Sequence, residues 1–169
     1  GRKTVDYFRD KFDDELSFLP IQKATSVPTE TILFNIDVEG PMEKDATAVL
    51  KVFAKVFYNH LGFYGNDLKL AKLEQFITKQ GKMDAFKASF KEKNGASWEK
   101  TRDTYAFFED HIIDTLVEVL GMSKDAAQHW FDGTETVDIS IGQLVDEIKD
   151  YVNTKPKDFR LLFMIDEAG

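Results

Sequence analysis

The sequence contains no cysteine, and this absence removes several kinds of chemistry. A chain without cysteine forms no disulfide, has no thiolate nucleophile and cannot hold zinc or an iron–sulfur cluster through sulfur. Its three histidines, His60, His111 and His129, do not stand at the spacing of a metal-binding motif such as H-E-x-x-H. We therefore expect no metal centre built from cysteine or histidine.

Long apolar runs are also missing. No stretch approaches the roughly 20 consecutive apolar residues that a membrane-spanning helix needs. Residues 1–6 lack the apolar region of a signal peptide. These features, together with the missing cysteines, predict a cytoplasmic protein that does not associate with membranes.

Arginine is scarce, since only four of the 22 basic residues are arginines. The net charge is −8, and the isoelectric point is near 4.9. An acidic chain with few guanidinium groups is poorly equipped for whole-surface affinity to nucleic acid or for reading bases.

Phenylalanine, in contrast, is abundant, with 15 copies in 169 residues of which 43% are apolar. This length and composition predict one domain with one hydrophobic core. We expect Trp98, Trp130 and most phenylalanines to lie in that core. Phe107 and Phe108 are adjacent, so one of them is expected to be exposed and to mark an interface.

The order of elements indicates an α/β protein that is predominantly helical. Apolar spacing predicts a first helix over 5–19 and then a polar connection bracketed by Pro20 and Pro28. Two segments, 31–38 and 160–165, read as strands of a parallel sheet that are buried on both sides. Between them we expect helices over 45–61, 67–93 (two short helices), 98–120 and 123–132, and one that begins at Ser140 with a capping box to Gln143.

Two strands alone do not make a satisfactory sheet, because their faces and edges stay unpaired. Either a further strand lies in 134–139, or partner strands lie outside this chain.

The most informative segment is 161–167, in which five apolar residues are followed by Asp166 and Glu167. This is the pattern of a Walker B strand, which carries carboxylates to the carboxyl edge of a sheet where ligands collect. In that interpretation Asp166 holds Mg²⁺ through water, and Glu167 orients the attacking water as general base. The alternative is an ordinary buried strand that ends in acids where it meets solvent. The phosphate-binding pattern G-x-x-x-x-G-K-[ST] has no match in the chain.

These residues resemble a known family. The run 157–169, KDFRLLFMIDEAG, looks like the Walker B region of the large P-loop ATPases of BREX phage-resistance systems (the BrxC/PglY type). Three other segments also resemble this family. They are FNID at 34–37, the Phe-rich helix 49–61 that runs into GFYG at 62–65, and the helix with Trp130 and Phe131.

The resemblance implies a fragment of a larger ATPase that lies between Walker A and Walker B. Its fold would be a partial P-loop NTPase (AAA+-like) sheet with a large helical insertion over 62–135. ATP and Mg²⁺ would bind the intact parent, with Asp166 as the Mg²⁺ ligand and Glu167 as the catalytic residue. We expect neither to bind this chain alone, and we expect the isolated chain to be inactive. Its partners would be other defence-system proteins or copies of itself.

Two further candidate sites are weaker. Asp37 stands at the end of the first strand and would lie near the nucleotide edge. Between 69 and 93, seven lysines face only three acids, so Lys79, Lys82, Lys87 and Lys91 are candidates to contact DNA phosphate or an acidic partner. The alternative for Asp37 is a polar residue where the chain leaves the core. The alternative for the lysines is a helix face that is simply solvated. A non-catalytic helical interaction module also remains an alternative for the whole chain.

Overall fold

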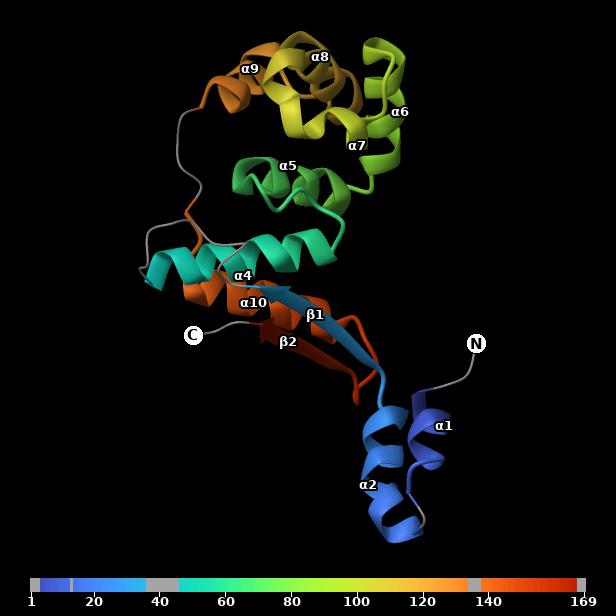
Figure 1. Ribbon diagram of the computed structural model, residues 1–169. Coiled ribbons are helices and arrows are strands. Elements are labelled where there is room, and N and C mark those ends of the chain that lie inside the picture. The colour runs from blue at the N-terminus through green and yellow to red at the C-terminus, as the bar shows by residue number, and fades with distance from the viewer. Residues whose placement is uncertain (1–3, 13, 36–45, 134–137, 167–169) are drawn as a thin grey trace. The chain divides into compact units, whose positions relative to one another are not determined.

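The computed structural model describes residues 4–12, 14–35, 46–133 and 138–166, and the chain is predominantly helical (Figure 1). In chain order the elements are α1 (Thr4–Arg9), α2 (Glu15–Ser26), β1 (Thr29–Asn35), α4 (Ala46–His60), α5 (Leu68–Lys79), α6 (Met83–Asn94), α7 (Trp98–Thr101), the 3-10 helix η1 (Arg102–Phe108), α8 (Glu109–Leu120), α9 (Lys124–Asp132), α10 (Ile141–Asn153) and β2 (Arg160–Asp166).

The chain forms two compact units. The first combines residues 1–44 with 140–169 and contains both strands, and the second is the continuous segment 45–139. The described residues of the second unit form helices joined by turns and irregular segments, with no strand among them. The interpretation of 62–135 as an insertion into an ATPase domain stays a prediction.

The two strands pair in parallel, as the sequence predicts. Thr29 lies opposite Arg160, and the register runs without a break to Asn35 opposite Asp166. The prediction that both strands are buried on both sides is wrong. Along β1 only Ile32 and Phe34 are buried, and no residue of β2 is fully buried. Alternate side chains of a strand point to opposite faces, so the two buried side chains lie on one face of the pair and the exposed Leu33 lies on the other.

A third strand in 134–139 is not found in the described part of that segment. Asp138 and Ile139 are outside any strand, and 134–137 lie outside the described residues. The pair therefore keeps both of its edges open among the residues that the structure describes.

Helix α10 begins as the sequence predicts. The Ser140 hydroxyl accepts the backbone N–H of Gln143 at 3.2 Å, and the Gln143 side-chain oxygen accepts the backbone N–H of Ser140 at 2.8 Å. This reciprocal capping box satisfies two N–H groups at the helix start that have no partner within the helix.

The second unit is built around an aromatic core. The Trp98 ring meets the rings of Phe86 and Phe90 edge to face, with centroids 5.1 Å and 5.0 Å apart. All three side chains are fully buried. Leucine and isoleucine side chains from α5 and α8 complete this cluster: Leu70, Leu73, Ile77, Ile112, Ile113 and Leu116.

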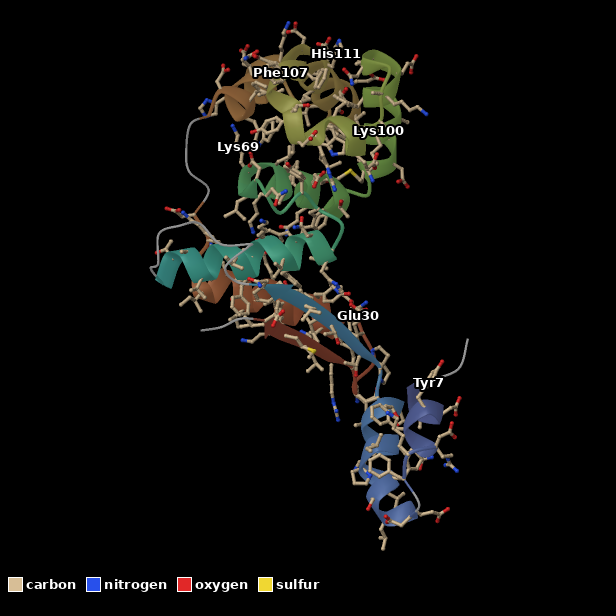
Figure 2. The ribbon with its side chains drawn as sticks, viewed as in Figure 1. Tyr7, Glu30, Lys69, Lys100, Phe107 and His111 are labelled. Atoms are coloured by element: carbon tan, nitrogen blue, oxygen red, sulfur yellow. The ribbon has the colours of Figure 1, made fainter. Side chains whose placement is uncertain are left out.

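The expected single helix over 98–120 is wrong, because it is divided into α7, η1 and α8. The break lies at Thr104, whose φ of −121° and ψ of 28° are not helical. The kink lets Phe108 reach Phe90, with ring centroids 6.5 Å apart, while Phe107 is 84% exposed (Figure 2). The expectation that one of the two adjacent phenylalanines is exposed is confirmed.

The expected helix over 5–19 is also divided. Helix α1 ends at Arg9, and α2 runs from Glu15 to Ser26 with Pro20 inside it. Its start is fixed by Asp14, whose carboxylate accepts the Ser17 N–H at 2.7 Å. The capped turn and the burial of Phe18 stabilise a helix that continues through the proline, although proline removes one helical hydrogen bond.

Candidate functional site

The candidate nucleotide edge lies where β1 and β2 end. Asp166 is the last residue of β2, is exposed, and stands level with Asn35 at the end of β1. Because the strands are parallel, both carboxyl ends meet at one edge, the place where open α/β sheets bind ligands. Glu167 and Asp37, the other two acids predicted for this edge, lie outside the described residues.

The opposite end of the sheet is held by a polar cluster around Glu30 (Figure 2). The Glu30 carboxylate accepts the Tyr151 hydroxyl at 2.5 Å and the Lys155 ammonium at 2.8 Å. The hydrogen bond to Glu30 raises the pKa of Lys155, and burial raises the pKa of the Tyr151 phenol. These contacts join the C-terminal end of α10 to β1, and β2 starts five residues after Lys155. The cluster thus ties the end of α10 to β1, five residues before β2 begins.

The four candidate lysines differ in their surroundings. The Lys82 ammonium donates to the carbonyl of Val119 at 2.7 Å, and Lys87 pairs with Glu99 at 2.7 Å. Lys79 and Lys91 are exposed on α5 and α6. Two of the four ammonium groups therefore have contacts within the chain. The binding of DNA or an acidic partner by these lysines stays a prediction.

Other lysines of this segment also bind within the chain. Lys69 donates to the carbonyls of Phe131 at 2.9 Å and Gly133 at 2.7 Å. Like Lys82 at the end of α8, Lys69 places positive charge at the C-terminal end of a helix, where carbonyl groups lack partners. Sequence spacing alone does not reveal these lysine–carbonyl contacts. The carbonyl groups are 62 and 64 residues from Lys69 and 37 residues from Lys82.

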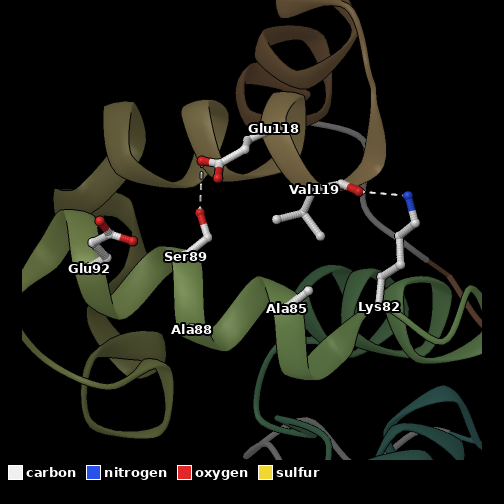
Figure 3. Close-up of a pocket in the computed structure, with 7 residues that line it drawn as sticks. All are labelled: Lys82, Ala85, Ala88, Ser89, Glu92, Glu118 and Val119. Atoms are coloured by element: carbon white, nitrogen blue, oxygen red, sulfur yellow. Dashed lines mark hydrogen bonds between the residues drawn. The ribbon is translucent and has the colours of Figure 1, made fainter.

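A pocket of about 460 Å³ lies between α6 and α8 (Figure 3). Its lining includes Ala85, Ala88, Ser89, Glu118 and Val119. The Ser89 hydroxyl donates to the Glu118 carboxylate at 3.0 Å, and Lys93 pairs with the same carboxylate. The hydrogen bond from Lys93 lowers the pKa of the Glu118 carboxyl. The Glu118 carboxylate thus joins Ser89 and Lys93 of α6 to α8.

Glu74 is a buried acid that the sequence reasoning missed. Its carboxylate accepts the Trp98 indole N–H at 2.6 Å, the Tyr64 N–H at 2.5 Å and the Arg102 guanidinium at 3.1 Å. Three donors compensate for its burial, which makes this a structural link between α5, the following helices and the turn at 62–66. The available signal was that Glu74 stands within the apolar stripe of α5, between Leu73 and Ile77.

Among the described residues, no group of three acidic or histidine side chains is placed to hold a metal ion. Within the same part of the chain, no helix is long and apolar enough to cross a membrane.

In comparisons with known proteins, no family model matches the chain, and no solved structure matches it.

Proposed function

We propose that this chain supplies the Walker B part of an ATP-hydrolysing P-loop domain, of the kind found in BREX phage-resistance ATPases. One observation carries the proposal: an exposed Asp166 ends a strand that runs parallel to, and in register with, its neighbour. A carboxylate held at the carboxyl edge of parallel strands is suited to bind Mg²⁺ on nucleotide phosphates.

In this proposal Asp166 holds the metal through water, and Glu167 takes a proton from the attacking water. The chain's own contribution is positional, because β2 pairs in register with β1, and Glu30 of β1 binds Tyr151 and Lys155 at the other end of the strands. Phosphates would be cradled by a P-loop outside these residues. Other defence-system proteins or further copies of the chain would bind the assembled ATPase.

The test uses the full-length protein that carries this segment. Glu167→Gln should lower ATP hydrolysis by about 10²-fold to 10⁴-fold, as expected for loss of a general base, while ATP binding is retained. Asp166→Asn should weaken the Mg²⁺-dependent part of nucleotide binding. Asp158→Asn is the matched control, since this exposed acid lies just before β2, at the other end of the strand.

Unchanged hydrolysis in Glu167→Gln would refute the assigned role. A full-length protein without any ATPase activity would favour the alternative of a non-catalytic helical interaction module.

A further inference from the structure

The helices α1 and α2 form a hairpin, residues 4–26, that leaves large apolar side chains exposed. Each helix packs mainly against the other. The exposed fractions are 40%, 39%, 81% and 53% for Phe8, Phe12, Leu16 and Leu19. Among the described residues of the hairpin, Phe18 is the one buried side chain. The hairpin therefore exposes far more apolar surface than it buries within itself.

Apolar side chains lie on two sides of α2. The ring of Phe18 lies under the Arg9 guanidinium of α1, which is 4.7 Å from the ring centroid. Leu16 and Leu19 are three residues apart and share another side of the helix. A helix that is apolar on more than one side is normally buried on more than one side. Helices of six and twelve residues are also too short to be stable without such packing. The hairpin therefore requires a second layer over Leu16 and Leu19.

The charge of this segment favours a second copy of the chain as that layer. Residues 1–26 contain five acids and five bases, so the remaining residues carry the whole net charge of −8. Two copies repel each other through that acidic remainder, but the neutral hairpin adds nothing to the repulsion. A helix that binds a membrane surface is instead rich in lysine and arginine on its polar face.

The size of the hairpin also fits an interface between two copies. A standard interface between proteins takes about 20–30 residues from each side. The structure describes 22 residues of the hairpin. Phenylalanine is enriched at interfaces, and the core of an interface between identical chains is more apolar than the rest of the surface. Phe8 and Phe12 of the hairpin match this composition.

We propose that two copies of the chain associate hairpin to hairpin across a two-fold axis, so that Leu16 and Leu19 of each copy are covered by the other. Because both copies use the same surface, this arrangement closes at a dimer. The inference goes beyond the proposed function and does not rest on it. Association requires no nucleotide, so it is tested without any measurement of ATPase activity.

Sedimentation equilibrium of the 169-residue chain tests the association itself. The mass should rise from 19.4 kDa towards twice that value as the protein concentration increases, and it should stop there. A mass that stays at 19.4 kDa at every concentration would overturn the proposal. Growth beyond two copies would also overturn it, because a two-fold contact leaves no surface for a third copy.

The substitution Leu16→Glu tests the location of the interface. It places a charge in the contact, yet it suits the folded hairpin because an acid is favourable in the first turn of α2. The dissociation constant of the dimer should rise at least about tenfold, while the circular dichroism of the helices is unchanged.

Leu33→Glu and Phe107→Glu are the matched controls, since they place the same charge at positions that are 70% and 84% exposed outside the hairpin. Both should leave the dissociation constant unchanged. A dimer that Leu16→Glu does not weaken, or that a control weakens equally, would overturn the proposal.

The absence of cysteine provides a second measurement, because one introduced thiol reports on one position. Leu19→Cys should react with a maleimide more slowly as the protein concentration rises, since only the dissociated copy exposes this side chain. Phe107→Cys should react at the same rate at every concentration. If Leu19→Cys reacts equally fast in the dimer, the interface lies elsewhere and the proposal fails. Slow labelling at every concentration would also overturn it, because Leu19 would then be covered within one copy.

Discussion

At the scale of single residues, Tyr105 has an unusual environment. Its hydroxyl donates to the Asp67 carboxylate at 3.2 Å, and Asp67 also accepts the Leu70 N–H at 3.0 Å as the N-cap of α5. Burial, with the nearby Asp67 charge, raises the pKa of Tyr105 to about 12. The phenol therefore links η1 to the start of α5 as a neutral hydrogen-bond donor.

This environment predicts a loss of stability at alkaline pH. The unfolded phenol releases its proton near pH 10.0 and the folded phenol only near pH 12, so Tyr105 stabilises the fold fully below pH 10.0. That contribution is lost as the pH rises through this window. We expect the difference in unfolding free energy between wild type and Tyr105→Phe to shrink by about 1–2 kcal/mol, less than the full shift implies because of solvent screening.

Urea unfolding below pH 10.0 and again near pH 12 measures this difference. Tyr7→Phe is the control, because it removes an exposed phenol. A constant difference between wild type and Tyr105→Phe across the window would disprove the role of the phenol.

At the scale of elements, α10 and α7 form a natural pair for measuring a helix cap. Both follow a serine in the N-cap position, Ser140 and Ser97. The Ser140 hydroxyl accepts a backbone N–H, whereas Ser97 makes no side-chain cap hydrogen bond. Ser140→Ala should therefore lower the unfolding free energy by about 0.5–2 kcal/mol, and Ser97→Ala by distinctly less.

Amide hydrogen exchange in the first turn of α10 provides a local measurement of the same effect. Equal losses of stability in the two variants would show that the cap hydrogen bond contributes nothing beyond serine itself.

The elements that the sequence predicts correctly are those formed by interactions between residues close together in the chain. The cap at Ser140 and the strand ending at Asp166 depend on residues close together in the chain. Elements whose form depends on contacts between distant residues differ from the prediction. The kink at Thr104 sends Phe108 towards Phe90 and Phe107 to solvent, and no spacing rule within 98–120 specifies it. Of the candidate site, Asp166 was placed at the expected edge, while the contacts of Lys82 and Lys87 with distant residues were not foreseen.

At the scale of the whole molecule, the abundance of phenylalanine predicts a hydrophobic core. The two units differ in how far their apolar side chains are buried. The large aromatic cluster belongs to the unit 45–139, where Phe86, Phe90 and Trp98 are fully buried. The strand unit instead leaves the side chains of Leu33, Leu162 and Met164 exposed. Among the described residues the sheet has two strands, and those three side chains lie on one of its faces.

The aromatic core provides the last prediction, a comparison of one substitution at a buried and an exposed position. Phe86→Ala removes a fully buried ring that meets Trp98 at 5.1 Å and should lower the unfolding free energy by about 3–5 kcal/mol. Phe107→Ala removes a ring that is 84% exposed and should change it by no more than about 0.5 kcal/mol. Both tryptophans lie in the unit 45–139, so tryptophan fluorescence during denaturation reports directly on that unit. A loss for Phe107→Ala as large as for Phe86→Ala would mean that Phe107 is covered in solution, and the distinction between a partly buried Phe108 and an exposed Phe107 would be wrong.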